Sequence, residues 1–427
     1  MRTRHSENAR TSASSEDGIS ADRRWMRLAL SLARLGMGRT HPDPRVGAVA
    51  VRHGRVLGIG AHLFFGGPHA EAALFTAAAP PEKDLRGATL YVNLEPCAHH
   101  GKTPACAPEI ARHGIARVVA AMEDPHPLVR GRGFECLATA GVDVRKGLLG
   151  HEARRVNAPF LWHLQTGRAL LTLKIAASLD GRIAANDGTS RWISGQMSRE
   201  WVHRRRAECD AIVIGRGTFL RDRPSLSARP STDPRARLRR RIPQAAGEWP
   251  HQPARVVVDS RARTAELDDF AGERGEPARG EPARGGPGSA GGRWIVACGA
   301  RAPEAAIARL ERRGVACWRL PDSGNGSGVD LHALAKRLGD EGLLDVMIEG
   351  GAALASGFLA EGLVDRLRLF VAPSVLGGTN TWTGDLRIAS LAGRLVLARM
   401  RARECGEDLL LSAESSALAA LEAGEEE

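Results

Sequence analysis

A histidine at the start of one apolar run and two cysteines after another restrict how this chain can fold. PHAEAALF (68–75) reads as the start of a helix, and EPCAHHGKTPAC (95–106) follows a strand-like stretch. Zinc prefers imidazole nitrogen and thiolate sulfur as ligands. A zinc site built from His69, Cys97 and Cys106 requires this helix and this strand to lie close together, as in a layered α/β domain.

Glu71 follows His69 by two residues, so it can reach a water on the metal without occupying the metal. A catalytic zinc site has three protein ligands and keeps one position for water, whose pKa the metal lowers. His-x-Glu followed by Pro-Cys and a second cysteine is typical of zinc-dependent deaminases, in which the glutamate moves protons. We therefore predict that His69, Cys97 and Cys106 bind zinc and that Glu71 is catalytic.

The interval between the two cysteines departs from the usual pattern and leaves alternatives open. Cys106 follows Cys97 by nine residues instead of three, and His99 and His100 lie between them as further possible ligands. A closed structural site with four protein ligands would give Glu71 no role. We prefer Cys106, because two thiolates and one imidazole match the deaminase class.

Strand-like and helix-like segments alternate along the chain, and the pattern restarts near residue 150. In a chain of 427 residues this indicates two α/β domains. Within the second domain, the Pro/Arg-rich stretch 230–252 and the GEPAR-containing stretch 271–292 offer little to a core, so we expect flexible inserts there. We predict a disordered tail at 1–21, a deaminase domain at 22–149, a second domain at 150–415 and a C-terminal tail at 416–427.

The first domain shows the clearest local signals. An amphipathic pattern with possible caps predicts a helix over 20–36, and two short apolar runs joined by His53-Gly54 predict a hairpin. The further predicted elements are a helix from 69, strands at 88–96 and 116–123, and a helix at 133–142.

The formal net charge of +11 raises the question of nucleic acid as a partner. Only five of the 60 basic residues are lysine, which suggests a general replacement of lysine by arginine. Aromatic residues make up only 4%, too few for a stacking platform. We therefore expect anionic small molecules, and not nucleic acid, as partners.

Membrane insertion and secretion are not indicated. No run of 18 uncharged apolar residues occurs, and the N-terminus lacks the apolar core of a secretory signal. The seven cysteines show no pairing pattern, so we expect mostly reduced thiols and a cytoplasmic location.

Three segments of the first half carry a resemblance to a known family. PHAEAAL, LYVNLEPCAHHGKTPAC and DPHPLVRGRG resemble the deaminase half of the bifunctional enzymes of riboflavin biosynthesis, in which the long interval between the cysteines is characteristic. The resemblance implies a cytidine-deaminase-like three-layer domain. It also implies deamination of a phosphoribosylated diaminopyrimidinone, followed by NADPH-dependent reduction of its ribosyl group.

The second half carries the resemblance independently. LKIAASLDGRIAANDGTSRWISG (173–195), RRRAECDAIVIGRGTFLRDRPSLSAR (204–229), RVVVDS (255–260), VMIEGGAALASGFL (346–359) and LVDRLRLFVAPSVLGG (363–378) resemble the family's reductase half. That resemblance implies a dihydrofolate-reductase-like fold and a homo-oligomer, expected to be a dimer through the reductase domain.

Matching positions suggest roles in the reductase half. The residues implied to contact NADPH are Ala176, Trp192, Thr218, Asp222, Ser260, Gly351, Ala352, Ala353, Leu354, Ala355, Ser356 and Gly357. The residues implied to contact the substrate are Lys174, Ser190, Arg206, Leu226, Arg229 and Glu349.

Physical chemistry supports some of these roles. The guanidinium groups of Arg206 and Arg229 suit a ribose 5-phosphate, because arginine binds phosphate in a fork. The glycines at 350–351 precede a predicted helix, and the N-terminus of a helix can bind a pyrophosphate. One departure concerns the first half, where Asp43 replaces the asparagine usual in the family. A carboxylate only accepts hydrogen bonds, so a family member with only one active half remains an alternative. The net charge of +11 leaves a nucleic-acid-acting zinc deaminase as a second alternative.

Overall fold

The chain forms two compact units. Unit 1 contains residues 1–161, 235–247 and 422–427, and unit 2 contains residues 162–234 and 248–421. The computed structural model describes residues 5–77, 84–98, 104–127, 129–242, 245, 249–267, 292–324 and 328–424, with side chains from Ile19 onward.

The boundary predicted between residues 149 and 150 lies instead between Leu161 and Trp162. Residues 150–161 belong to unit 1 because the side chain of Asn157 is hydrogen-bonded to the backbone of Arg45 in that unit. The side-chain oxygen of Asn157 accepts a hydrogen bond from the N–H of Arg45 (2.7 Å), and its amide donates to the carbonyl oxygen of Arg45 (3.1 Å). The local sequence pattern marks a helix here but does not say which sheet the helix joins.

Unit 1 alternates strands and helices, and the predicted hairpin and helices are present. Its elements are α1 (His5–Ala33), η1 (Arg34–Gly36), β1 (Gly47–Arg52), β2 (Arg55–Ala61), α2 (Ala70–Ala77), β3 (Thr89–Val92), α3 (Cys106–Arg112), β4 (Arg117–Ala120), α4 (Arg132–Thr139), β5 (Asp143–Arg145), α5 (Gly150–Val156), α6 (Ala158–Thr166, which extends past the boundary) and α9 (Ala236–Arg239).

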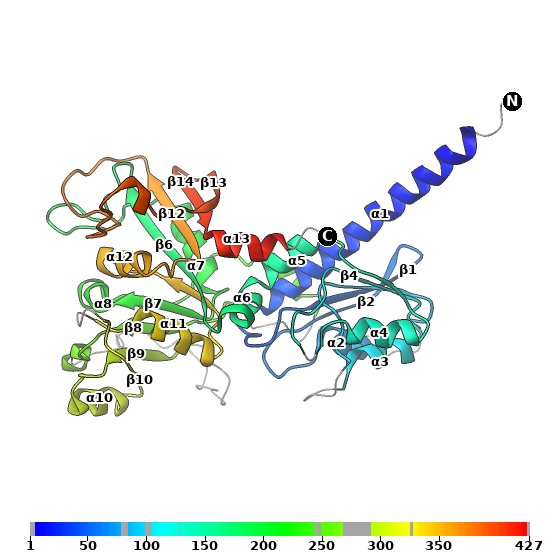
Figure 1. Ribbon diagram of the computed structural model, residues 1–427, viewed down its shortest axis with the longest axis horizontal. Helices are drawn as coiled ribbons and strands as arrows, with labels where there is room; N and C mark the ends of the chain where they lie inside the picture. Colours follow the sequence, from blue (N-terminus) through cyan, green and yellow to red (C-terminus); the bar gives the residue numbers. More distant parts are fainter. Residues whose placement is uncertain are drawn as a thin grey trace. The chain divides into compact units, whose positions relative to one another are not determined.

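The sheet of unit 1 has the order β2-β1-β3-β4-β5, with β1 antiparallel to β2 and β3 and the remaining pairs parallel. One face packs on α1. There, a side chain at Gly47 would lie 2.2 Å from the carbonyl oxygen of Ala29, so only glycine fits. The other face carries the main apolar core, in which Leu90 and Val118 of the sheet meet Leu74 of α2 and Ile110 of α3. This helix–sheet–helix arrangement confirms the expected three-layer fold (Figure 1).

The predicted helix over 20–36 is correct at its end, because α1 and η1 reach Gly36. It begins earlier, at His5, so the prediction of a disordered tail over 1–21 is wrong from His5 onward. Extending a helix costs far less than starting one, since each added residue gains one backbone hydrogen bond. The part of α1 that packs on the sheet is the nucleus from which the helix extends towards His5.

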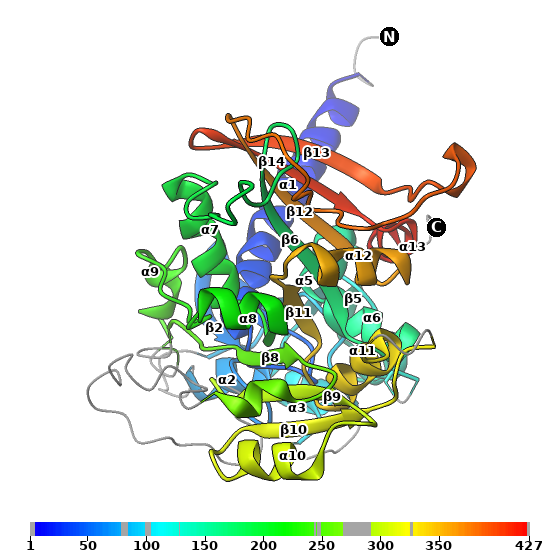
Figure 2. The same ribbon diagram turned by 90° about the vertical axis from the view of Figure 1, so that its left-hand side faces the viewer.

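Unit 2 has the larger sheet (Figure 2). Its elements are β6 (Leu170–Ser178), α7 (Gln196–Arg206), β7 (Ala211–Gly215), α8 (Arg216–Asp222), β8 (Ala254–Val258), η3 (Arg263–Glu266), β9 (Trp294–Gly299), α10 (Glu304–Glu311), β10 (Ala316–Leu320), α11 (Leu331–Asp340), β11 (Asp345–Ile348), α12 (Ala352–Ala360), β12 (Arg366–Ala372), η4 (Leu391–Gly393), β13 (Ala398–Cys405), β14 (Asp408–Glu414) and α13 (Ser416–Ala423, which extends into unit 1).

The strands of unit 2 follow the order β10-β9-β8-β7-β11-β6-β12-β14-β13. All neighbouring pairs are parallel except the two that involve β14. Apolar cores cover both faces. Leu334 of α11 and Phe358 of α12 belong to one core, and Phe219 of α8 and Leu310 of α10 belong to the other. Strands buried on both faces explain the continuous apolar runs in the sequence.

Two stretches that we expected to be irregular contain helix. Within 230–252, α9 is helical, and Arg239 and Ile242 are buried. The predicted tail at 416–427 contains α13, in which Leu418 is buried. Alanine and leucine favour helix, and burial of a few side chains is enough to select it. The predicted insert at 271–292 lies outside the described residues except for Gly292. No described helix is long and apolar enough to cross a membrane.

Candidate zinc centre and reductase site

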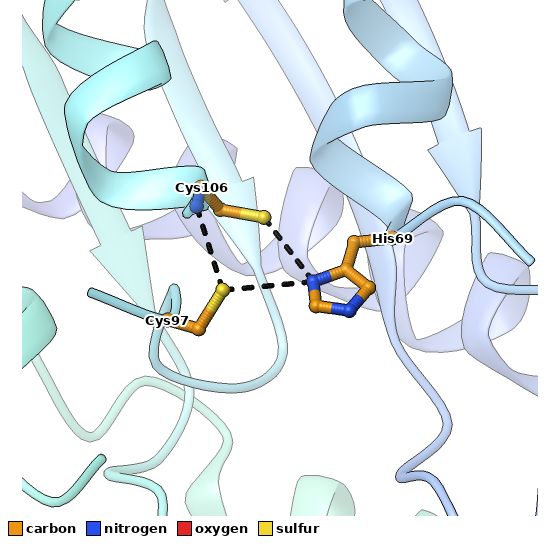
Figure 3. Close-up of side chains that lie close together, drawn as sticks. All are labelled: His69, Cys97 and Cys106. Carbon is orange, nitrogen blue, oxygen red and sulfur yellow. Dashed lines mark hydrogen bonds between the residues drawn. The ribbon is translucent and has the colours of Figure 1, made fainter. Parts of the chain in front are cut away.

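His69, Cys97 and Cys106 form a compact group (Figure 3). Nδ1 of His69 lies 3.6 Å from Sγ of Cys97 and 3.4 Å from Sγ of Cys106. The three potential ligand atoms all lie within 4.8 Å of one another, and among the described residues no further histidine, cysteine or acidic residue joins them. One imidazole and two thiols at this spacing fit a zinc ion.

The ends of secondary-structure elements position the three side chains. His69 directly precedes α2, Cys97 follows the loop after β3, and Cys106 is the first residue of α3. The backbone N–H of Cys106 donates to Sγ of Cys97 (3.4 Å), and the N–H of Ala107 donates to the carbonyl oxygen of Cys97 (3.0 Å). Both sulfurs therefore lie next to one imidazole.

The charges in this group are distributed unequally. Hydrogen bonds from Cys106 and His69 lower the pKa of Cys97 to about 4. The hydrogen bond to Cys97 raises the pKa of His69 to about 8, and the same partner raises the pKa of the Cys106 thiol. Cys97 is therefore the first thiolate, and thiolates are the form that binds zinc. His99 and His100, the alternative ligands, lie outside the described residues.

Glu71 lies in the first turn of α2 and is only 3% exposed. Burial raises the pKa of its carboxyl group, and negative charge on Cys97 adds to this effect. The carboxyl group is hydrogen-bonded to Cys106 but does not belong to the group of potential ligands. A carboxyl group whose pKa is raised beside a metal site can exchange protons with a reacting molecule near neutral pH.

His62 lies beside this site, and no sequence pattern identifies it beyond its place at the end of a predicted strand. It is almost fully buried, and its ring meets the ring of His69 edge-on, with centroids 5.9 Å apart. Its Nδ1 donates to the carbonyl oxygen of Pro68 (2.9 Å), and its Nε2 lies 3.3 Å from the carboxylate of Asp43. Burial alone would raise the pKa of Asp43, but the hydrogen bond and the charge of His62 lower it overall.

In unit 2, the predicted residues Arg206, Glu349 and Lys174 lie together. Nε and Nη2 of Arg206 donate to the two carboxylate oxygens of Glu349 at 2.7 and 2.9 Å. Burial lowers the pKa of Lys174, although the charge of Glu349 opposes this effect. Burial works against ionised Glu349, but Arg206 lowers the pKa of Glu349 overall. The ion pair between Arg206 and Glu349 offsets the cost of burying a carboxylate directly after the apolar strand β11.

Two other predicted residues meet at the start of α12. The backbone N–H of Gly351 donates to Oγ1 of Thr218 (3.1 Å), which joins the first turn of α8 to the turn before α12. At Gly350, a side chain would lie 2.8 Å from Leu354. Glycines followed by the N-terminus of a helix leave backbone N–H groups accessible at close range, and this arrangement fits the pyrophosphate of a dinucleotide.

The remaining predicted residues are spread around the same unit. Lys174 and Ala176 lie on β6, Asp222 ends α8, and Arg191 donates to the carbonyl oxygen of Asp222 (2.8 Å). Trp192 is 71% exposed. Neither Ser190 nor Ser260 hydrogen-bonds another predicted residue within the part of the chain that the structure describes. Leu226 is buried, Arg229 is exposed, and Ala352, Ala353, Leu354, Ala355, Ser356 and Gly357 form the first part of α12.

Comparison with family models divides the chain in the same way. Residues 19–122 match the cytidine and deoxycytidylate deaminase zinc-binding region. Residues 169–411 match the RibD C-terminal domain. The first match covers the His69 group and the second covers most of unit 2.

Whole-length relatives carry both regions. Riboflavin biosynthesis protein RibD of Aquifex aeolicus is 35% identical over 392 residues, which cover 91% of this chain and 97% of that protein. The Escherichia coli protein of the same name is 37% identical over 356 residues (83% of this chain, 89% of that protein).

Solved structures agree. A diaminohydroxyphosphoribosylaminopyrimidine deaminase/5-amino-6-(5-phosphoribosylamino)uracil reductase from Thermotoga maritima superposes with a TM-score of 0.74 at 28% identity, covering 93% of this chain and 99% of that chain. Acinetobacter baumannii RibD superposes with a TM-score of 0.73 at 32% identity, with the same coverage.

Proposed function

The chain belongs to the RibD family of bifunctional deaminase/reductases of riboflavin biosynthesis, and we propose that it acts on the substrates named for the Thermotoga relative. Unit 1 would deaminate a diamino-hydroxy-phosphoribosylaminopyrimidine. Unit 2 would then reduce the ribosyl group of the resulting 5-amino-6-(5-phosphoribosylamino)uracil with NADPH. The observation that carries this proposal is the group of His69, Cys97 and Cys106 beside buried Glu71, in one chain with a reductase domain.

In unit 1, we assign His69, Cys97 and Cys106 as the residues that hold zinc, since their donor atoms already converge. Zinc in such a site activates water for attack on the ring carbon that carries the amino group. The hydrogen bond from the N–H of Cys106 to Sγ of Cys97 favours the thiolate form of Cys97 and fixes the direction of its sulfur.

Glu71 moves the proton. Its carboxylate takes a proton from the attacking water and delivers it to the amino nitrogen, which leaves as ammonia. Burial supports this role, because a pKa raised above the ordinary value lets one carboxyl group both accept and donate near neutral pH. The helix α2 carries both His69, at its start, and Glu71, so their separation is fixed by the helix backbone.

NADPH bound in unit 2 would supply the hydride that reduces the ribosyl group to a ribityl chain. The turn at Gly350 and the first N–H groups of α12 would bind its pyrophosphate. Arg206 holds the carboxylate of Glu349 in one orientation, and Lys174 lies near both. We place the pyrimidine ring against these three residues.

We assign Arg229 as the residue that binds the phosphate of the substrate. Both Arg206 and Arg229 were expected to bind it, but two nitrogens of Arg206 are bonded to Glu349. Arg229 is exposed on the segment after α8, so its guanidinium can meet a phosphate in a fork.

We also propose that the protein works in the cytoplasm as a homodimer through the reductase unit. β13 is the outer strand of the nine-stranded sheet, and Met400 on it is 76% exposed, with Leu391 and Val396 nearby in sequence at 82% and 65%. Exposed apolar side chains at a sheet edge favour pairing with a second copy. Light scattering after size-exclusion chromatography tests this, and a monomeric mass would contradict it.

Zinc content and two activities measured on one preparation test the proposed function. Ammonia release from the diamino substrate reports unit 1, and NADPH oxidation with the deaminated product reports unit 2. The proposal predicts about one zinc per chain and both activities. Zinc-bound protein that releases no ammonia would favour the alternative of a single active half, which Asp43 motivates. Tight, salt-sensitive oligonucleotide binding would favour a nucleic-acid-acting enzyme.

A further inference from the structure

Glu95 is a buried carboxylate that neither proposed reaction uses. It lies two residues before Cys97, in the loop after β3, and is only 4% exposed. Its backbone N–H donates to the carbonyl oxygen of Met122 (3.0 Å), beyond the end of β4. A buried carboxylate needs hydrogen-bond partners that offset the loss of water. Residues before α4 and at its start supply them.

Four backbone N–H groups donate to the carboxylate of Glu95. Oε2 accepts from Asp124 (3.2 Å) and Gly131 (3.0 Å), and Oε1 accepts from Gly133 (2.9 Å) and Phe134 (3.3 Å). An ionised carboxylate offers about four acceptor positions, so this one is saturated. The last two donors belong to the first turn of α4, whose N–H groups have no partner within the helix.

A second contact shows how closely the two segments approach. A side chain at Gly133 would lie 1.9 Å from the carbonyl oxygen of Pro96. Only glycine lets the start of α4 touch the backbone between Glu95 and Cys97. On its other side, Cys97 accepts hydrogen bonds from α3, at Sγ and at its carbonyl oxygen. The segment 95–97 is therefore fixed by both α3 and α4.

From these contacts we infer that Glu95 is a positioning residue of the deaminase site, which holds Cys97 against Asp124, Gly131 and the start of α4 and so sets the place of its sulfur. This inference rests on the proposed zinc site. Without the carboxylate, the four N–H groups would lose their common acceptor, and the backbone that carries Cys97 would lose its anchor on α4. Residues that orient metal ligands through hydrogen bonds typically change metal affinity by about 10- to 100-fold when replaced.

Glu95→Gln tests the inference, because it keeps the shape but places an amide NH₂ against two of the N–H donors. Glu135→Gln is the matched control, since Glu135 lies on α4 and is exposed. The zinc dissociation constant, measured by competition with a chelator, should rise about 10- to 100-fold in the first variant only. Because zinc has no visible spectrum, Co²⁺ is the geometric probe, and its visible absorption bands should shift in the first variant only.

NADPH oxidation by unit 2 serves as an internal control and should be unchanged in both variants. If Glu95→Gln does not fold in unit 1, Glu95→Asp replaces it, and the same changes are expected with smaller size. Wild-type zinc affinity and Co²⁺ bands in a folded Glu95 variant would overturn the inference, even if the variant were less stable. Failure of the wild-type protein to bind zinc would instead overturn the proposed function.

Discussion

The two sites of this chain are built on different principles. The candidate zinc site draws its donors from residues 69–106, at the ends of two helices and one loop, and zinc itself dictates which residue types can serve. The reductase site draws on residues from β6 to α12, on and after inner strands of the nine-stranded sheet. There, backbone N–H groups and mutual ion pairs matter as much as residue type. The first kind of site can be recognised from its sequence pattern, whereas the second required a family resemblance.

Removal of zinc should separate the two sites most strongly. After treatment with a chelator, ammonia release should fall to background, while NADPH oxidation with the deaminated product should stay unchanged, because the proposed metal ligands lie in unit 1. Adding zinc back should restore ammonia release. Loss of both activities would mean that the two units do not work independently, and loss of neither would contradict the zinc assignment.

Glu71→Gln should have the next largest effect. The amide cannot carry the proton, so the rate of deamination should fall by about 10²- to 10⁴-fold. Metal analysis should find zinc retained, because Glu71 lies outside the ligand group. NADPH oxidation provides the control on the same protein. Deamination at a wild-type rate would exclude Glu71 as the proton carrier.

Glu349→Ala should act on unit 2 alone. It leaves Arg206 buried without its partner, so the free energy of unfolding of unit 2 should fall by about 3 kcal/mol, and NADPH oxidation should be lost. Chemical denaturation measures the first effect. Glu341→Ala is the control, since the ion pairs of Glu341 with Arg293 (3.1 Å) and Arg337 (2.7 Å) are at the surface and each should contribute under about 1 kcal/mol. Equal losses in both variants would contradict the importance of burial.

The smallest effect concerns Asp180, in the turn after β6. Its carboxylate accepts hydrogen bonds from the hydroxyl of Ser178 (2.6 Å) and from the N–H groups of Leu376 (3.1 Å) and Gly377 (2.7 Å). Ser178 contributes most to lowering its pKa to about 2 from the ordinary 3.8. Because the pKa of Asp180 is lower in the folded state, its ionised carboxylate stabilises the fold at pH values above the ordinary pKa. This stabilisation is lost as the pH falls through the lower pKa of the folded state.

Asp180→Asn should therefore lower the midpoint of unfolding slightly at pH 6, and by less at pH 3, where the wild-type group has begun to lose its advantage. Denaturant titrations at the two pH values measure the gap, which is the difference in unfolding midpoint between the wild-type protein and the variant. A gap that stays equal or widens at pH 3 would contradict the proposed role of the ionised carboxylate.

Much of unit 1 was predictable because its signals are local. The hairpin, the helix ending at Gly36 and the convergence of His69 with the two cysteines all follow from residue types and spacing. The N-terminal extension of α1 to His5 and the helix α13 were missed. The first segment is polar, and the second is short and ends in the charged GEEE, so neither has a strong helical pattern. Their helical form depends on cooperativity and, for α13, on burial that a local pattern does not contain.

Long-range partners account for the other differences. The pairing of Arg206 with Glu349 joins residues 143 positions apart, and the hydrogen bond of Gly351 with Thr218 joins residues 133 apart. Neither pair has a spacing rule in the sequence. Glu95 was missed for the same reason. Its four partners lie later in the chain, at Asp124, Gly131 and the first turn of α4, and nothing next to Glu95 in the sequence identifies them.

The central claim is that one chain carries two independent active sites, and the most direct test is a paired assay on a single preparation of the wild-type protein with known zinc content. Ammonia release from the diamino substrate and NADPH oxidation with its deaminated product are followed in parallel. Our account predicts both activities, with only the first lost on zinc removal. NADPH oxidation without ammonia release from zinc-loaded protein, or ammonia release without NADPH oxidation, would contradict it.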